Sequence, residues 1–132
     1  EIFSNRLEFG QATQTALPML IAEELDVSMS RVRGLLAPAG DPYRDPMYGI
    51  QMTGGSTAVA HSWMQYREIG ATARAMLVQA AANRWKVPVA EIRTEDGHCI
   101  AGARRASYAS LAAAAAKLPV PEKVALKDAK TF

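Results

Sequence analysis

Two glycines flanked by hydroxyl residues, in the run Thr53-Gly54-Gly55-Ser56-Thr57, form the part of this sequence best suited to chemistry. The run opens a long proline-free stretch, Ser56 to Lys86, whose apolar spacing predicts a helix. Glycines allow a tight, exposed backbone, and the first turn of a helix presents free amide protons and a partial positive charge. That combination suits a phosphate or a carboxylate. A plain Gly-Gly turn with Ser56 as the helix N-cap accounts for the same residues and is the commoner arrangement.

A second candidate is Gly10-Gln11, a glycine break at the end of a predicted strand with an amide side chain beside it. One amide holds both hydrogen-bond donors and an acceptor, so Gln11 suits a heterocyclic ligand. A solvated loop glutamine is the simpler interpretation of the same residue. Because no lysine follows the glycines of residues 53–57, the nucleotide-triphosphate loop GxxxxGKS/T is absent.

The other reactive side chains do not combine into a catalytic set or a metal site. Glu23 and Glu24 are adjacent on a predicted helix, so their side chains diverge and cannot act as an acid–base pair. His98 and Cys99 are neighbours on a predicted strand and point to opposite faces. His61 stands alone on the polar face of the long helix, where we expect it to be solvated. We therefore predict no catalytic residue and no metal ligand in this chain.

Composition limits the classes of partner. The chain has 132 residues, enough for one globular domain over residues 1–132. Its 15 basic and 13 acidic residues leave a net charge of +2 without a dense basic run, which argues against nucleic acid. No stretch approaches the ~20 consecutive apolar residues of a membrane-spanning helix. The single cysteine, Cys99, excludes an internal disulfide framework.

Apolar spacing and turn residues predict an α+β domain with the order β-α-β-α-β-β-α. We expect one small sheet of about four strands, packed with one long and two shorter helices. The predicted elements are a strand at Ile2–Phe9, a helix with Thr15 as its N-cap and Pro18 in its first turn that ends near Asp26, a strand at Arg31–Leu36, the long helix between Ser56 and Lys86, strands at Glu91–Glu95 and His98–Ala101 joined by an Asp96-Gly97 turn, and a helix at Tyr108–Leu118 capped by Ser107.

The long helix carries one apolar stripe, which we expect to face the core. Its members are Val59, Trp63, Tyr66, Gly70, Ala73, Leu77 and Ala80. The alanines and Gly70 would let another backbone approach closely. The loop Ala37–Gly49 before this helix holds three prolines and two glycines, and loops of this length are often functional.

Several motifs resemble the large molybdopterin-binding subunits of the xanthine dehydrogenase and aldehyde oxidase family, nearest the branch of isoquinoline 1-oxidoreductase β-subunits and related bacterial aldehyde dehydrogenases. The motifs that carry the resemblance are Glu8-Phe9-Gly10-Gln11, the L-P-x-x-x-A-E-E-L-x-V run from Leu17 to Val27, Ala37-Pro38-Ala39, Asp45-Pro46-Met47-Tyr48-Gly49, Gln51 to Thr57, Gly70 to Arg74, and Leu118-Pro119-Val120-Pro121. The chain departs from the family's G-Q-G at Ala12 and from the glycine common at position 50, which is Ile50 here.

The resemblance implies a molybdenum hydroxylase that oxidises aldehydes or N-heterocycles with water as the oxygen source. It implies a molybdenum pyranopterin, in this branch as the cytosine dinucleotide, with Gln11 beside Gly10 in contact with the pterin. By the same resemblance, the cofactor's polar and phosphate region is bound by Thr53, Gly54, Gly55, Ser56 and Thr57. The implied partners are the remainder of the large subunit and a small [2Fe-2S] subunit, in the bacterial periplasm or cytoplasm.

Two hypotheses for function follow. In the first, residues 1–132 are one segment of the molybdenum-binding region of a longer oxidoreductase subunit, whose catalytic glutamate lies outside this chain. Such a segment is expected to be inactive by itself, to hold the cofactor weakly or not at all, and to dimerise through apolar surface that its neighbours would cover. In the second, the chain is a stand-alone domain that binds a small anion or a partner without catalysis.

Overall fold

The chain folds into three α-helices and five short strands, described by a computed structural model that covers residues 1–132. In chain order the elements are β1 (Ile2–Ser4), α1 (Thr13–Leu25), β2 (Gly34–Leu36), α2 (Ala58–Trp85), β3 (Arg93–Glu95), β4 (His98–Ala101), β5 (Arg104–Ser107) and α3 (Tyr108–Ala115). This arrangement confirms the predicted α+β class. No helix is both long enough and apolar enough to cross a membrane.

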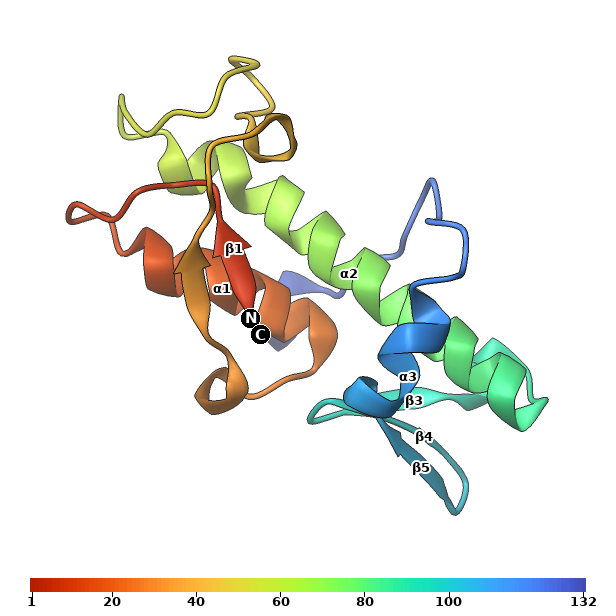
Figure 1. Ribbon diagram of the computed structural model, residues 1–132. Coiled ribbons are helices and arrows are strands. Elements are labelled where there is room, and N and C mark those ends of the chain that lie inside the picture. The colour runs from red at the N-terminus through yellow and green to blue at the C-terminus, as the bar shows by residue number, and fades with distance from the viewer.

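The strands form two separate sheets where we had expected one. β1 and β2 pair in parallel, with Ile2 opposite Gly34 and Ser4 opposite Leu36. β3, β4 and β5 form an antiparallel sheet in sequential order. β5 is an additional strand that the sequence did not reveal, because its two arginines look like a solvated loop. Figure 1 shows the two sheets at different ends of the molecule, with α2 running between them.

α2 joins two apolar cores. The first is formed by Leu17, Leu20, Ile21 and Tyr66, between α1 and the N-terminal half of α2. The second lies between the C-terminal half of α2, the antiparallel sheet and α3, and consists of Val78, Ala80, Ala81, Cys99, Ala106, Leu111 and Ala115. Each core alone is small. Because α2 contributes residues to both, it joins them into one folded unit.

Gly70 is where α1 and α2 come closest. A Cβ atom at this position would lie 2.8 Å from Glu24 Cβ and 3.0 Å from the carbonyl oxygen of Ile21. This confirms the expected close approach of another backbone. The rest of the predicted stripe is less regular: Tyr66 is buried, but Trp63 is 39% exposed and is not a core residue.

Several predicted boundaries were wrong, because tertiary contacts decide them. β1 ends at Ser4 instead of Phe9, because the chain then leaves the sheet and places Asn5 and Arg6 in a buried polar cluster. α1 begins at Thr13, two residues before the predicted cap, and Pro18 therefore lies inside it. β2 is shorter than predicted and α3 ends at Ala115, before Leu118. The predicted cap of α3 is confirmed, because Ser107 Oγ accepts a hydrogen bond from the Ser110 N–H at 3.3 Å.

Candidate functional site

The carboxylate of Glu8 organises the backbone around Gln11. It accepts hydrogen bonds from the N–H groups of Gly10 at 2.8 Å, Ala12 at 3.1 Å and Gln14 at 3.1 Å. The bonds from Gly10, Gln14 and Ala12 lower the pKa of Glu8. Gly10 and Ala12 both have positive φ, 114° and 57°, so residues 10–12 form a tight turn before α1, which we call the glutamine turn. Among the first amides of this helix, Glu8 satisfies that of Gln14, and the predicted cap Thr15 lies inside the helix.

Gln11 lies in the glutamine turn with its side-chain amide free. It is half-buried, and its amide makes no hydrogen bond within the chain. A Cβ added at Gly10 would meet no atom within 4 Å, so the space beside the turn is open. The amide of Gln11 can therefore both donate to and accept from a ligand.

Residues 53–57, the glycine turn, form a second tight turn immediately before α2. Gly55 and Ser56 have φ values of 61° and 56°, and Thr57 closes the turn by donating its N–H to the Gly54 oxygen at 3.3 Å and its hydroxyl to the same oxygen at 2.9 Å. Thr57 precedes the helix, and its side chain caps no amide. Ser56 is exposed and its hydroxyl has no partner in the chain, so it is not the N-cap of the plain-turn interpretation.

The first amides of α2 have no acceptor within the chain. The N–H of His61 donates to the Thr57 oxygen at 2.9 Å, but those of residues 58, 59 and 60 make no hydrogen bond. A helix start of this kind carries a partial positive charge together with unsatisfied donors. Ala58 is fully buried, whereas Val59 is half-buried and Ala60 is exposed. With the Ser56 hydroxyl, the amides of residues 59 and 60 therefore form a small set of donors suited to an anion.

The structure brings the two predicted turns to the same end of the molecule. The N–H of Leu7, just before the glutamine turn, donates to Thr53 Oγ1 at 2.8 Å. Figure 1 shows the red loop that leads into α1 and the yellow-green loop that leads into α2 at this end. Segments that are more than forty residues apart in sequence are thus linked by a direct hydrogen bond.

A buried arginine that the sequence analysis missed lies behind the glycine turn. Arg6 has no exposed surface, and its three donor nitrogens all have acceptors. Nε donates to Ser62 Oγ at 3.0 Å, Nη1 donates to the Met52 carbonyl at 2.6 Å, and Nη2 forms an ion pair with Asp45. The one signal in the sequence was a charged residue inside a strand-like stretch.

Asp45 lies in the loop of residues 37–49, which we call the proline-rich loop, and is fully buried beside Arg6. Its Oδ1 accepts hydrogen bonds from the N–H groups of Met47 at 2.7 Å and Tyr48 at 2.9 Å. Burial raises the pKa of Asp45, but the hydrogen bonds from Arg6 and from these amides outweigh that effect and lower the pKa to about 2. The carboxylate is therefore charged at neutral pH and compensates Arg6.

His61 is not solvated as expected. It lies in the first turn of α2 with only a fifth of its side chain exposed, and its Nδ1 is 3.5 Å from Asp45 Oδ2. Nδ1 is buried without a hydrogen-bond partner. The ring packs against Tyr48 with the ring centres 5.5 Å apart. His61 therefore belongs to the polar cluster behind the glycine turn.

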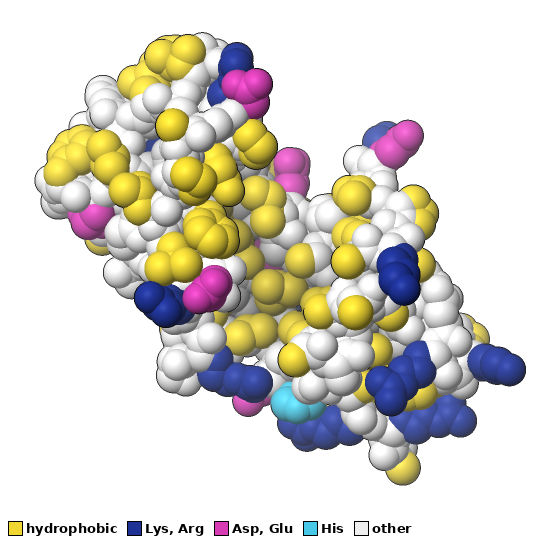
Figure 2. Space-filling model, viewed as in Figure 1, with side chains coloured by type: hydrophobic (Ala, Val, Ile, Leu, Met, Phe, Trp, Pro, Cys, Tyr) yellow, Lys and Arg dark blue, Asp and Glu magenta, His cyan; other side chains and the backbone are white.

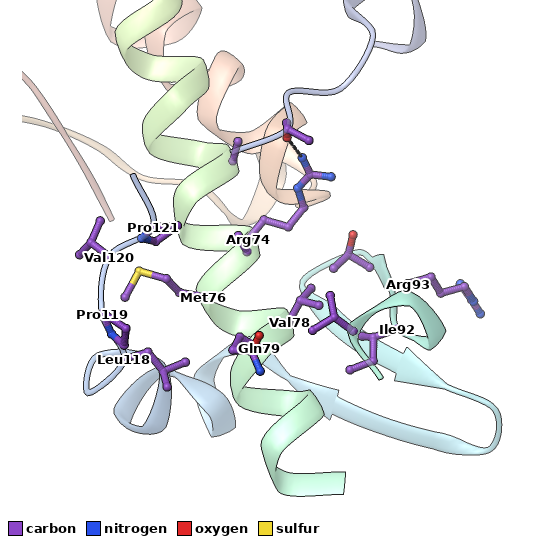
Figure 3. A pocket seen from close by; sticks show the side chains of 15 residues that line it. Arg74, Met76, Val78, Gln79, Ile92, Arg93, Leu118, Pro119, Val120 and Pro121 are labelled. Atoms are coloured by element: carbon purple, nitrogen blue, oxygen red, sulfur yellow. Dashed lines mark hydrogen bonds between the residues drawn. The ribbon is translucent and has the colours of Figure 1, made fainter. Parts of the chain in front are cut away.

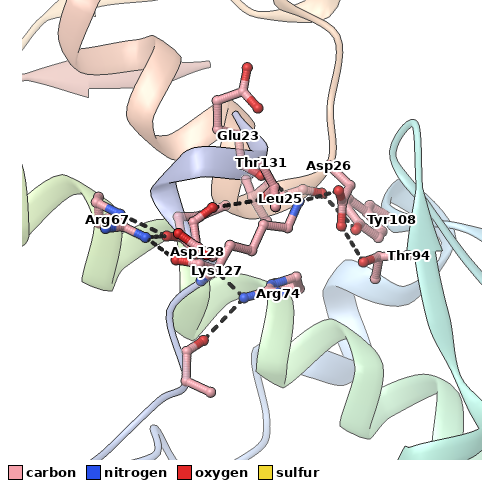
Figure 4. Close-up of polar contacts among 12 residues, drawn as sticks. Glu23, Leu25, Asp26, Arg67, Arg74, Thr94, Tyr108, Lys127, Asp128 and Thr131 are labelled. Atoms are coloured by element: carbon pink, nitrogen blue, oxygen red, sulfur yellow. Dashed lines mark hydrogen bonds and ion pairs between the residues drawn. The ribbon is translucent and has the colours of Figure 1, made fainter.

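A second buried ion pair joins α1, α2 and the C-terminal residues. Glu24 is fully buried and accepts hydrogen bonds from Arg67 Nε at 2.9 Å and Nη2 at 2.7 Å. Its other oxygen accepts the Lys127 N–H at 3.1 Å, and Lys127 Nζ donates to the Glu23 carbonyl at 2.7 Å. Figure 4 shows Lys127 between α1 and the arginines of α2. Glu24 thus contributes its carboxylate to this network, whereas Glu23 contributes its backbone carbonyl.

A large cavity lies away from both turns. It has a volume of about 860 Å³ and runs along α2 between residues 71 and 79, bounded by β3 and by residues 118–125. Figure 3 shows Met76, Val78 and Ile92 lining it, with Arg74 and Arg93 nearby. We call it the apolar groove. No three His, Cys, Asp or Glu side chains converge in this chain as metal ligands would.

Comparison with known proteins gives consistent matches. The profile of the molybdopterin cofactor-binding domain family matches residues 1–132. The chain is 39% identical over 126 residues to the beta subunit of isoquinoline 1-oxidoreductase from Brevundimonas diminuta, which covers 92% of this chain and 16% of that protein. It is 35% identical over 99 residues to a nicotinate dehydrogenase subunit of Pseudomonas putida, covering 75% of this chain and 8% of that protein.

A third relative is the membrane-bound aldehyde dehydrogenase (pyrroloquinoline-quinone) of Gluconacetobacter polyoxogenes, 36% identical over 77 residues, which cover 58% of this chain and 9% of that protein. The chain thus spans less than a fifth of the length of each of these relatives. The matches confirm the resemblance drawn from the motifs. Since the family profile extends over every residue, the chain belongs to the molybdopterin cofactor-binding domain family.

Proposed function

We propose that this chain is the cofactor-holding segment of a molybdenum hydroxylase that oxidises aldehydes or N-heterocycles with water as the oxygen source. The names of the relatives support the reaction class, since two refer to the N-heterocycles isoquinoline and nicotinate and one to an aldehyde. The observation that carries the proposal is the pair of unpaired N–H groups at residues 59 and 60, at the start of a 28-residue helix whose first residue, Ala58, is buried.

The donors at this end of the molecule fit the phosphate region of a molybdenum pyranopterin. The unpaired amides and the exposed Ser56 hydroxyl are all hydrogen-bond donors. The nearest buried carboxylate, Asp45, is compensated by Arg6 and does not repel an anion. When bound, the cofactor supplies the redox centre, whereas the residues of this chain bind and orient it.

We further propose roles for the individual residues. The glycine turn, with Thr53, Gly54, Gly55, Ser56 and Thr57, binds the phosphate region through backbone amides and hydroxyls. Gln11, presented by Gly10, hydrogen-bonds the pterin through its free amide. We take the cofactor to be the cytosine dinucleotide form, as the family resemblance implies. Release of the nucleotide by acid hydrolysis, followed by chromatography, identifies the base.

The remainder of a longer subunit is the proposed main partner, and a small [2Fe-2S] subunit accepts the electrons. Exposed apolar surface supports the first of these partners. Figure 2 shows apolar side chains gathered where β1, β2 and the loop before α2 lie, and Phe3 and Leu36 of the two-stranded sheet are about half exposed. Parallel sheets are normally covered on both faces, so this sheet is incomplete by itself.

Blocking the glycine turn in the full-length subunit tests the function. A Cβ at Gly54 meets only Met52 Cε at 3.5 Å, so Gly54→Val is expected to fold. Its branched side chain fills the space over the turn, and we expect the molybdenum content to fall about tenfold, equivalent to ~1.4 kcal/mol of binding. Ala103→Val, in the exposed turn between β4 and β5, is the control and keeps the metal.

Two outcomes separate the hypotheses. Loss of molybdenum in Gly54→Val with an unchanged melting temperature supports cofactor binding by the glycine turn. A wild-type subunit that contains no molybdenum when produced in a host that makes the cofactor contradicts the proposal, and favours a domain that binds a small anion without catalysis.

A further inference from the structure

Arg6 links the start of α1 to three points between residues 45 and 62, which are far from it in the sequence. Its guanidinium contacts Ser62 in α2, the Met52 carbonyl just before the glycine turn, and Asp45 in the proline-rich loop, which are 56, 46 and 39 residues away. Its own carbonyl accepts a hydrogen bond from Gln14 Nε2 at 3.2 Å, at the start of α1. The backbone before each of the two turns is therefore tied to this one residue.

We propose that Arg6 is the positioning residue of the cofactor site: it sets where the glycine turn lies relative to the first turn of α2 and to the glutamine turn. The inference rests on the proposed function. A guanidinium is planar, and its donors have fixed directions, so acceptors bound to it in one plane cannot rotate independently. The carbonyl of Met52 and the hydroxyl of Ser62 are thereby fixed on the two sides of the glycine turn.

Asp45 neutralises the charge of Arg6 behind the glycine turn. It accepts the ion pair from Arg6 through Oδ2 and holds the backbone of residues 47 and 48 through Oδ1. The pair adds no net charge behind the turn, so the attraction for an anion comes from the free helix amides. Arg6 therefore acts on the site through geometry, and through Asp45 it is connected to the backbone of the proline-rich loop.

Arg67 provides a matched control within the same chain. It is also a buried arginine paired with a fully buried carboxylate, Glu24, and it also donates to a backbone carbonyl, that of Lys127. It joins α1 to α2 and to the C-terminal residues, with no contact to the glycine turn. Substitutions at Arg6 and Arg67 therefore both disturb a buried arginine–carboxylate pair, although Glu24 also contacts Arg74 at 3.3 Å, and only Arg6 lies at the proposed site.

The test uses Arg6→Lys and Arg67→Lys in the full-length subunit. A lysine keeps the charge opposite the carboxylate but cannot serve the other acceptors in their plane. We measure the melting temperature, the molybdenum content and the rate of cofactor release, followed by the fluorescence of the oxidised pterin. Both variants are expected to lose stability, and the release rates are compared relative to that loss. Arg6→Lys is expected to release the cofactor about tenfold faster, and Arg67→Lys less than about twofold faster, as loss of charged hydrogen bonds at one site predicts.

Ser62→Ala supplies a milder variant that decides the question if Arg6→Lys does not fold. It removes one of the three acceptors and leaves Arg6 Nε buried without a partner, so we expect release about threefold faster and a smaller loss of melting temperature than in Arg6→Lys. Release rates that follow the loss of stability equally at Arg6 and Arg67, or that do not change in Ser62→Ala, overturn the inference. A wild-type subunit without molybdenum refutes the proposed function instead, so the two failures are distinguishable.

Discussion

At Asp45, burial and hydrogen bonding act on one carboxylate in opposite directions. Burial raises its pKa, whereas Arg6 and the amides of Tyr48 and Met47 lower it to about 2 from an ordinary value of 3.8. Because the pKa is lower in the folded state than in the unfolded one, the charged form stabilises the fold above the unfolded pKa. That contribution is lost as the pH falls towards the folded pKa.

Asp45→Asn is expected to lower the free energy of unfolding by about 3 kcal/mol at pH 7, because it leaves Arg6 buried without a counter-ion. The difference from wild type should shrink as the pH falls from about 4 to about 2, where the wild-type carboxylate is itself protonated. Urea unfolding at a series of pH values measures this difference. A gap of constant size down to about pH 2.5 would mean that the Arg6–Asp45 pair does not titrate in this range.

Cys99 is a buried thiol in the core between α2 and α3. Burial raises its pKa to about 11 from 9.0, so very little thiolate is present near neutral pH. We expect iodoacetamide at about pH 8 to label Cys99 at least about a hundredfold more slowly in the native chain than in urea, as the lower thiolate fraction alone predicts. Mass spectrometry measures the labelling, and Ala103→Cys, at an exposed position, is the rapidly labelled control.

At the level of secondary structure, the sequence predicted those elements that local signals determine. The proline-free run produced α2, the Asp96-Gly97 turn joined β3 to β4, and Ser107 capped α3. Each of these depends on residues within a few positions of one another. The glycine turn and the glutamine turn were found in the same way, from their glycines.

The features that the sequence did not reveal depend on distant contacts. β5 exists because it pairs with β4, although Arg104 and Arg105 give it no apolar pattern. The role of Arg6 follows from partners 39 to 56 residues away, and that of Glu24 from Arg67, 43 residues away. No local spacing carries such information, so the supports of the site could be identified only in the structure.

Gly70→Ala tests the close crossing of α1 and α2. Alanine favours a helix over glycine by about 1 kcal/mol, but its Cβ would lie 2.8 Å from Glu24 Cβ and 3.0 Å from the Ile21 oxygen. Because one of these atoms belongs to the backbone, the helices must separate, and we expect a net loss of about 1–3 kcal/mol in the free energy of unfolding. Urea unfolding measures it.

Gly40→Ala is the matched control for this substitution. Gly40 has extended backbone, and a Cβ there meets no atom closer than 3.6 Å. We expect a change within about 0.5 kcal/mol. If Gly70→Ala is as stable as Gly40→Ala, α1 and α2 do not pack as closely as described.

At the scale of the whole molecule, much apolar surface is uncovered. Large apolar side chains are exposed around β1 and β2, on the loop before α2 and beside the apolar groove (Figures 2 and 3). The most exposed of them are Phe9, Met47, Ile50 and Val120. Contiguous apolar patches on a soluble chain mark surfaces that a partner covers.

We therefore expect chains of residues 1–132 to associate in solution. Sedimentation velocity should show a dimer fraction that increases with protein concentration. Added salt should strengthen the association, because the contact is apolar and carries little net charge. Weak dimers form at about 100 μM. A chain that remains monomeric at this concentration would show that this surface needs no partner.

A single unbroken helix, α2, runs from the glycine turn to the three-stranded sheet (Figure 1). α2 has 28 residues and extends over ~42 Å at ~1.5 Å per residue, without a proline or another kink-forming interruption. A partner that binds the three-stranded sheet would therefore also determine the orientation of the glycine turn, because α2 connects the two. Under the proposed function, a displacement of the three-stranded sheet would therefore shift the proposed cofactor site at the other end of α2.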